Sequence, residues 1–125
     1  MASNTHPAAA LRQRLPLVFT AHSAETAYLK EIICVFVLRE GRVPVNPFMS
    51  YGYFLYGMVD KDTIRSANNT LVARCDELWT FGAPSDGVLV EIELARELGM
   101  PVRSFDIDHH GTRIVEAATG TPAVC

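Results

Sequence analysis

With 125 residues, of which 49% are hydrophobic and 20% charged, the chain has the composition of one compact domain and leaves no room for a second. Its net charge of -3 excludes general binding to a nucleic acid polymer, which needs a basic surface, so a nucleotide partner would be recognised one molecule at a time. Cys34, Cys75 and Cys125 are odd in number and widely spaced, which excludes a disulfide framework or a cysteine zinc site and indicates a reducing, cytoplasmic location.

The first part of the chain predicts an arm, a strand and a ligand-facing loop. Residues 1–15 are polar and alanine-rich without the long apolar core of a signal peptide, so we expect a mobile N-terminal arm. Leu17–Ala21 predicts the first strand, and Ser23 is the expected cap of the helix that follows. Open α/β sheets bind ligands beyond the carboxyl ends of their strands, so His22 is predicted to contact a sugar or donate a proton to a leaving base. The alternative is a solvated loop histidine.

The helix predicted at 24–40 contains seven consecutive apolar residues at 32–38, which cover every side of it. A surface helix needs only one apolar stripe, so we expect a homodimer or larger homo-oligomer with one side of this helix against another copy. A second strand follows at 42–48. Because Pro44 and Pro47 restrict its ladder hydrogen bonds, this strand is predicted at the edge of the sheet.

Five aromatic residues gather at 48–57. A packed hairpin or a second oligomer contact explains such a cluster, because aromatic side chains dominate both cores and interfaces. A loop that leaves the edge strand on the ligand side and stacks its rings on a nucleobase explains it equally. On this second hypothesis, Tyr51 and Tyr53 are the predicted base-binding residues.

The rest of the chain alternates helices and strands. The expected elements are a helix at 60–75 capped by Asp60 or Asp62, a strand at 76–82, a helix from Ser85 or Asp86 to Gly99, a strand at 101–107 and a final edge strand at 112–116. We expect 117–125 to be a loose tail. Residues 16–116 therefore predict a single three-layer α/β domain with a mainly parallel sheet of four or five strands, flavodoxin-like or Rossmann-like.

The helix that starts at Ser85 or Asp86 carries a carboxylate in its core stripe. Helical spacing places five side chains on one face: Val88, Glu91, Ile92, Ala95 and Leu98. Helical side chains lean toward the N-terminus, so the Glu91 carboxylate is predicted to lie over the turn at Gly87, where the missing side chain leaves room for a ligand. The free N–H groups of this helix end suit a phosphate or a sugar. The alternative is that Glu91 pairs with a neighbouring Arg or Lys and that Gly87 merely eases entry into the helix.

Residues 84–102, Pro-Ser-Asp-Gly-Val-Leu-Val-Glu-Ile-Glu-Leu-Ala-Arg-Glu-Leu-Gly-Met-Pro-Val, resemble the signature of the nucleoside 2-deoxyribosyltransferase-like family. That family includes 2-deoxynucleoside 5-monophosphate N-hydrolases. The shared pattern is Pro-Ser-x-Gly-Val-x-x-Glu, followed by Ala and then Leu-Gly-x-Pro. The resemblance implies that Glu91 is the nucleophile that attacks the anomeric carbon, and that Ser85 and Gly87 hold the sugar or its phosphate.

The chain departs from the family's pattern at two places. The first strand-to-helix loop, 20–24, has neither the glycines nor the phosphate-binding arginine often found there, which leaves His22 and Ser23 as its binding candidates. Asn68 stands where relatives often carry an aspartate. An asparagine holds a ligand hydroxyl but does not act as a base, so Asp86 is the candidate for the missing carboxylate.

The predicted function is cleavage or transfer of the N-glycosidic bond of a nucleoside or nucleoside monophosphate, without a metal or an organic cofactor. Asp and His residues at 106–111 suggest metal ligands, but nothing elsewhere completes the set at a recognisable spacing. The alternatives are a non-catalytic module of the same fold that binds a nucleotide or related small ligand, and a structural oligomerisation domain. No membrane span is predicted.

Overall fold

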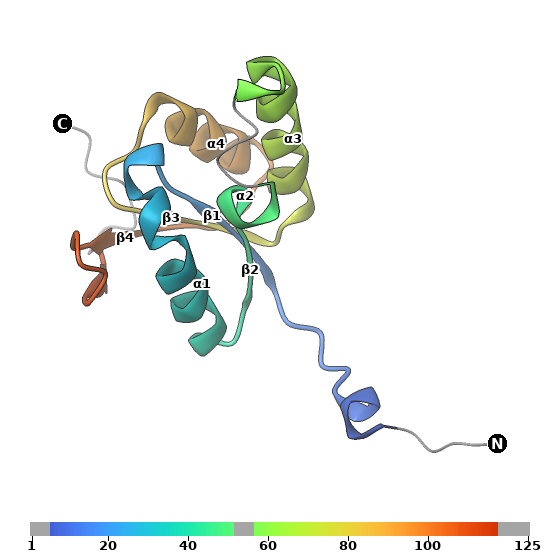
Figure 1. Ribbon diagram of the computed structural model, residues 1–125. Coiled ribbons are helices and arrows are strands. Elements are labelled where there is room, and N and C mark those ends of the chain that lie inside the picture. Colours follow the sequence, from blue (N-terminus) through green and yellow to red (C-terminus); the bar gives the residue numbers. More distant parts are fainter. Residues whose placement is uncertain (1–5, 52–56, 118–125) are drawn as a thin grey trace.

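The structure is a computed structural model that describes residues 6–51 and 57–117. Its centre is a five-stranded sheet in the order β2-β1-β3-β4-β5 (Figure 1). The strands are β1 Leu17–Ala21, β2 Val43–Val45, β3 Glu77–Phe81, β4 Val102–Ile107 and β5 Ile114–Glu116. The first four are mutually parallel and β5 runs antiparallel to β4. The mainly parallel α/β fold predicted from the sequence is confirmed.

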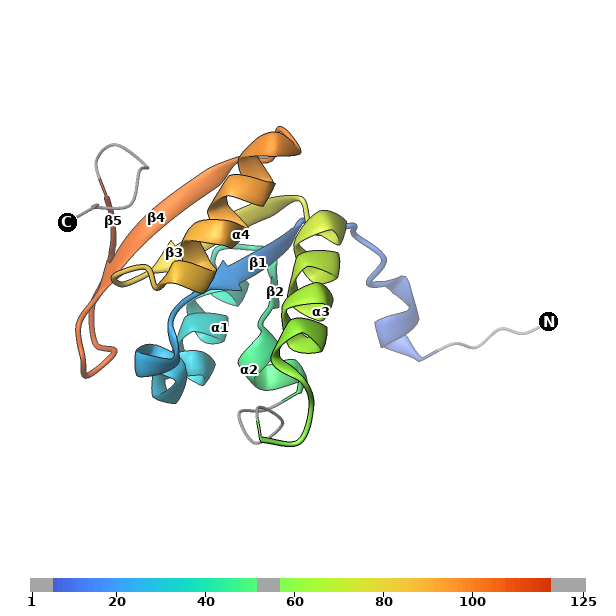
Figure 2. The same cartoon turned by 90° about the horizontal axis from the view of Figure 1, so that it is seen from above.

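Helices cover both faces of the sheet, with α1 on one side and α3 and α4 on the other (Figure 2). The helical elements are η1 Pro7–Ala10, η2 Ala24–Leu29, α1 Lys30–Arg39, α2 Pro47–Ser50, α3 Lys61–Arg74 and α4 Asp86–Glu97. Strand alternation divides the core in two. In β3, Trp79 and Phe81 pack toward α1. Leu78, which directly precedes Trp79, points to the other face of the sheet and packs toward α3 and α4.

Local signals set the ends of the two helices that border the ligand side of the sheet. Asp60 caps α3 by accepting from the Thr63 N–H at 3.3 Å, and Ser85 caps α4 by accepting from the Val88 N–H at 3.3 Å. Gly99 ends α4 with a φ of 72°, a left-handed conformation that favours glycine. Leu98, predicted on the buried face, is instead 52% exposed because it is the C-cap residue, beyond the last turn.

The segment between β1 and α2 differs from its prediction in two respects. The helix expected at 24–40 is a 3-10 helix, η2, followed by α1, and Ser23 at its N-cap makes no side-chain capping bond. The strand expected at 42–48 is shorter than predicted, since β2 ends at Val45. A new helix, α2, begins at Pro47, and the Asn46 side chain caps it by accepting from the Met49 N–H. The predicted edge position of β2 is confirmed.

The ends of the chain lie partly outside the description. Residues 6–15 form η1 and an extended stretch that projects from the sheet (Figure 1). The predicted tail at 117–125 is described only at Ala117. Over the described ranges, none of the helices has the length and apolar character needed to cross a bilayer.

Candidate functional site

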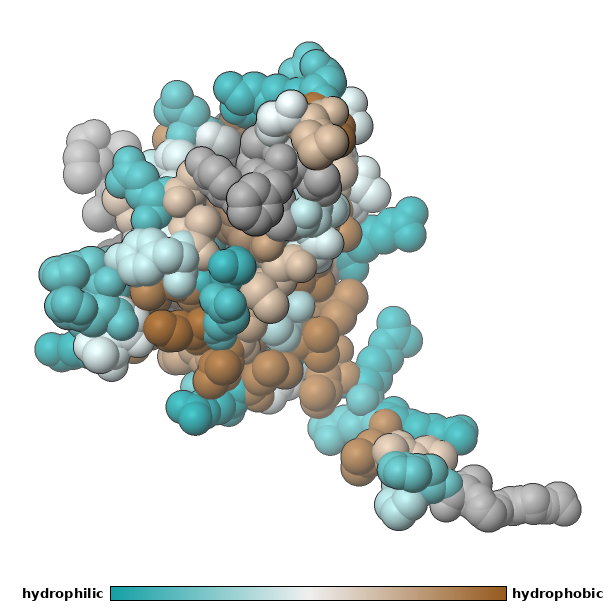
Figure 3. Space-filling view, viewed as in Figure 1, coloured by the Kyte–Doolittle hydropathy of each residue, from teal (hydrophilic) through white to brown (hydrophobic). Residues whose placement is uncertain are grey.

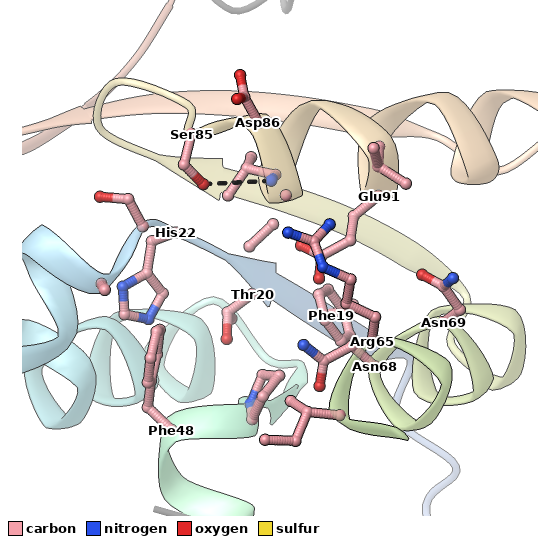
Figure 4. A pocket seen from close by; sticks show the side chains of 18 of the residues that line it. Phe19, Thr20, His22, Phe48, Arg65, Asn68, Asn69, Ser85, Asp86 and Glu91 are labelled. Atoms are coloured by element: carbon pink, nitrogen blue, oxygen red, sulfur yellow. Dashed lines mark hydrogen bonds between the residues drawn. The ribbon is translucent and has the colours of Figure 1, made fainter. Parts of the chain in front are cut away.

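A pocket of about 560 Å³ lies at the carboxyl ends of β1 and β3 (Figure 4). The chain leaves β1 toward β2 on one side and leaves β3 toward β4 on the other, so this is the point where the strand order reverses. Open α/β sheets bind their ligands at such a switch point. The volume is within the range of pockets that hold small molecules.

The wall formed by β1 and the end of β2 is a closed hydrogen-bond network. The Asn46 amide nitrogen lies 2.8 Å from Thr20 Oγ1 and 2.9 Å from His22 Nε2. Thr20 Oγ1 donates to the Val45 carbonyl, and the Asn46 oxygen accepts from the Met49 N–H. Every polar side-chain atom of Thr20, His22 and Asn46 therefore has a partner within the fold.

The direction of these bonds assigns the protonation of His22. Because the Asn46 amide nitrogen only donates, His22 Nε2 is the acceptor and the ring proton is on Nδ1. Nδ1 donates to Thr26 Oγ1 at 2.9 Å, and Thr26 in turn donates to the Ser23 carbonyl at 3.0 Å. Burial lowers the pKa of His22 to about 4, so the ring is neutral at pH 7.

This geometry corrects two readings of His22. The ring is 5% exposed and 4.9 Å from the Phe48 ring, so it is not a solvated loop side chain. It lines the pocket, as predicted for a residue that contacts a ligand. It has no spare proton for a leaving base, however, since Nδ1–H is bonded to Thr26 and Nε2 accepts from Asn46. In this arrangement both ring nitrogens of His22 are engaged within the wall.

The opposite wall is formed by the start of α4 and one side of α3. Ser85, Gly87 and Glu91 all line the pocket, as their sequence spacing predicts. A Cβ added at Gly87 would meet no heavy atom closer than Ser85 Oγ at 3.9 Å, so the protein itself does not require a glycine there. The free N–H groups of the first turn of α4 border the same space.

Glu91 is half-buried, and burial raises its pKa to about 7. Two neighbours on α3 oppose the shift: the positive charge of Arg65 and a hydrogen bond from the Asn68 side chain. Both residues line the pocket, and in Figure 4 they lie with Glu91 on one side, across from His22 and Phe48. The alternative interpretation was that Glu91 pairs with a neighbouring cation. Arg65 is such a neighbour, but its charge does not offset the effect of burial, so the pKa of Glu91 stays raised.

Asn68 has an unused acceptor. Its amide oxygen is buried and makes no hydrogen bond within the described part of the chain, while its side chain is bonded to Glu91. A buried carbonyl oxygen without a donor costs free energy, so such atoms are few and often meet a ligand or water. The position suits the predicted contact of Asn68 with a ligand hydroxyl.

Other predicted residues are placed less favourably. Asp86 lines the pocket, as predicted, but its side chain is exposed, and in Figure 4 its carboxylate points away from Glu91. Ser23 lines the pocket through its loop. Tyr51 is half-buried beyond the end of α2 and does not line the pocket, and Tyr53 lies outside the described residues. The aromatic ring beside His22 is that of Phe48.

Sequence reasoning missed most of the α3 contribution. Lys61, Arg65 and Asn69 line the pocket, and the first two are one helical turn apart on the same face. The sequence did contain a signal for these residues. Lys61, Arg65 and Asn68 follow one another at helical spacing of four and three positions, so they share one side of α3, next to the buried positions Ile64 and Val72.

The Asp and His cluster at 106–111 begins at the end of β4 and continues into the turn that leads to β5. The Asp108 carboxylate accepts from the Thr112 N–H, the Thr112 hydroxyl and the Arg113 N–H. Within residues 6–51 and 57–117, no three His, Cys, Asp or Glu side chains come together as ligands for a metal ion.

Comparison with known proteins gives one family. Residues 19–105 match the model of a family described as "Domain of unknown function (DUF7768)". The chain belongs to this family. The matched range runs from within β1 to within β4 and includes all of the residues that line the pocket. No curated protein matches the chain.

The DUF7768 domain is similar in fold to the 2-desoxiribosyltransferase from Leishmania mexicana, with a TM-score of 0.55 and 19% sequence identity. The alignment covers 74% of this chain and 65% of that chain, so the protein spans about two-thirds of the transferase's length. At this identity the likeness shows a shared fold. The resemblance first drawn from residues 84–102 is thereby confirmed at the level of the fold.

Proposed function

We propose that this protein cleaves or transfers the N-glycosidic bond of a nucleoside or nucleoside monophosphate, with Glu91 as the nucleophile. The observation that carries the proposal is the half-buried Glu91 carboxylate, which lines the switch-point pocket with a pKa raised to about 7. A strongly perturbed carboxyl group in such a pocket is typical of a reacting group. The similarity in fold to a 2-desoxiribosyltransferase supports the same class of reaction.

The proposed reaction has two displacements. Glu91 attacks the anomeric carbon, the carbon–nitrogen bond breaks with its electron pair going to the base, and the base leaves after taking up a proton. The sugar is then bound to Glu91 as an ester. Water or a second base attacks the same carbon, restores the carboxylate and releases a proton, which gives hydrolysis or transfer.

The electrostatic balance at Glu91 suits this role. A carboxylate with a higher pKa is a stronger nucleophile, but only its ionised form attacks. With a pKa of about 7, a substantial fraction is ionised at neutral pH. Arg65 and Asn68 favour that ionised form.

The pocket also has groups for a phosphate. Lys61 and Arg65 line one side and the N-terminus of α4 lies at another, so a nucleoside monophosphate would meet two cations and free N–H groups. The loop at 20–24 lacks the arginine often present in relatives. In this proposal the cations of α3 take over its task.

The test is to incubate the protein with a panel of nucleosides and their 5-monophosphates and to separate any released base by chromatography. We expect release by the wild type and a loss of at least about a thousandfold in Glu91→Gln. The control is Glu93→Gln, on the exposed side of the same helix, which should retain wild-type activity. If Glu91→Gln releases base at the wild-type rate, Glu91 is not the nucleophile.

A second function, ligand binding without chemistry, has one specific observation in its favour: Asn68 replaces the aspartate often present in relatives of the resembled family. Calorimetric titration of the same panel separates the two functions. Binding of a nucleotide without base release would establish the non-catalytic module, whereas binding together with release establishes the enzyme.

A further inference from the structure

The outer side of α1 is an apolar patch formed by Ile32, Val35 and Leu38, which are 38%, 44% and 56% exposed. Figure 3 shows hydrophobic side chains gathered over this helix. Ile33 and Val37, on the inner side of α1, are fully buried in the core, so the patch is additional to what the fold needs. Contiguous exposed apolar side chains on one helix mark an interaction surface.

We propose that the α1 patch binds a second copy of this chain, with the two α1 helices antiparallel and a twofold axis at Val35. The apolar positions of the patch are arranged symmetrically about Val35 along the helix. Ile32 and Leu38 are each three positions from Val35, and they lie on opposite sides of it around the helix. A twofold interface requires such a self-complementary surface, because each contact occurs twice.

The charges at the ends of the patch fix the direction. Glu31 and Arg39 are each four positions from Val35, and both are exposed. Antiparallel pairing about Val35 brings Glu31 of one copy to Arg39 of the other, twice, and Ile32 of one copy to Leu38 of the other. Parallel pairing would instead bring Glu31 against Glu31 and Arg39 against Arg39, and like charges across an interface are unfavourable.

The surroundings leave this surface available. The exposed Glu31 has an ion pair of 3.6 Å with its half-buried neighbour Lys30, and such pairs at the surface are weak. Beside the patch, a groove of about 390 Å³ runs between α1 and the residues Gly111, Thr112 and Ile114. A Cβ added at Gly111 would lie 2.6 Å from Ile32 Cδ1, so the loop is already seated against the inner edge of Ile32. The groove offers space for side chains of the second helix.

This inference is independent of the proposed function. α1 covers one face of the sheet, whereas α3 and α4 on the other face supply the wall that contains Glu91 (Figures 1 and 2). A monomer with full activity would therefore overturn the interface alone, and an inactive dimer would overturn only the enzyme.

Sedimentation velocity of the whole chain at micromolar concentration tests the interface. We expect a dimer for the wild type. Val35→Glu places two carboxylates at the axis and should weaken the dimer about a hundredfold or more. The matched control is Leu89→Glu, at a position of α4 that is 41% exposed, which should remain dimeric. A monomeric wild type, or equal weakening by both variants, overturns the proposal.

Charge exchange tests the antiparallel direction without depending on the apolar core. Glu31→Arg alone and Arg39→Glu alone each turn two attractive contacts into repulsive ones and should weaken the dimer about tenfold at low salt. The double variant with both substitutions restores opposite charges across the axis, so its dissociation constant should return to near the wild-type value. Failure of the double variant to recover would overturn the antiparallel pairing.

Discussion

The two walls of the pocket use their polar groups in opposite ways. On the β1 wall, the Thr20, His22 and Asn46 side chains satisfy one another and nearby backbone groups, and the imidazole is held neutral by burial. On the α3 and α4 wall, the pKa of Glu91 is raised to about 7 and the Asn68 oxygen has no donor among the described residues. A completed network resists change, whereas groups left short of partners gain from a ligand.

The difference distinguishes a scaffold from a reacting wall in the same cavity. His22 and Glu91 both line the pocket, and both are titratable residues at a predicted ligand-binding edge. Type and position alone would assign a chemical role to either. The contacts favour Glu91 as the reacting residue, because both ring nitrogens of His22 already have hydrogen-bond partners within the protein. Four further expectations test this distinction, from the largest effect to the smallest.

Asn46→Ala should lower the free energy of unfolding by about 3 kcal/mol. The substitution removes the donor to Thr20 and His22 and also the cap of α2. Urea denaturation measures the change. Asn69→Ala, a half-buried pocket residue on α3, is the control and should change stability little. Equal stability of Asn46→Ala and wild type would show that the β1 wall is not held by this network.

The rate of base release should rise with pH through about 7. The reaction needs the ionised form of Glu91, whose folded-state pKa is about 7, so kcat/KM should be about a hundredfold lower at pH 5 than at pH 8. His22, with a pKa of about 4, should contribute no inflection in that range. A rate that is constant from pH 5 to pH 8 would contradict the assignment of the reacting wall.

The same ionisation predicts a stability difference between wild type and Glu91→Gln. Burial raises the pKa of Glu91 from 4.5 to about 7, so wild-type stability from this group is lost as pH rises from 4.5 through 7. Glu91→Gln lacks that loss, and its stability advantage over wild type should be about 2 kcal/mol larger at pH 7 than at pH 4.5. Denaturation at the two pH values measures it.

The matched variant for this comparison is Glu93→Gln, at an exposed position of the same helix, measured at the same two pH values. His22 acts in the opposite direction. Its pKa is lowered from 6.5 to about 4, so its contribution to stability is lost as pH falls through that range in both proteins. An advantage of Glu91→Gln that is the same at both pH values would mean that the carboxyl group does not titrate as described.

Arg65→Ala should weaken binding of a nucleoside monophosphate about tenfold and affect the matching nucleoside less, because one charge-assisted contact to phosphate is removed. Calorimetric titration of the pair measures both affinities. Arg74→Ala, in the last turn of the same helix, is the control. Equal loss for nucleoside and monophosphate would show that Arg65 does not contact the phosphate.

Local sequence signals predicted much of the fold. The buried runs at Leu17–Ala21 and Glu77–Phe81, the caps Asp60 and Ser85, and the stop at Gly99 each depend on a few adjacent residues. The side of the sheet on which the pocket lies was predicted, because open α/β sheets bind ligands beyond the carboxyl ends of their strands. Ser85, Gly87 and Glu91 all line that pocket, and the helical repeat places Gly87 and Glu91, four positions apart, on the same side of α4.

Features that depend on distant residues were not predictable in this way. The state of His22 is set by Asn46, which is 24 positions away in sequence. The placement of Lys61 and Arg65 along the pocket depends on how α3 packs against the sheet and α4. The end of β2 after Val45 was missed for a different reason: it is set locally, by the hydrogen bond that the Asn46 side chain accepts from the Met49 N–H, which starts a helix in place of further strand.

The measurement that most directly tests the central claim is mass spectrometry of the protein, quenched in acid during the first turnovers with a substrate found in the base-release panel. The account predicts one sugar bound to the protein, on the peptide that contains Glu91, and no such adduct in Glu91→Gln. Base released in those turnovers with the protein's mass unchanged, or a sugar on a peptide that lacks Glu91, would contradict it.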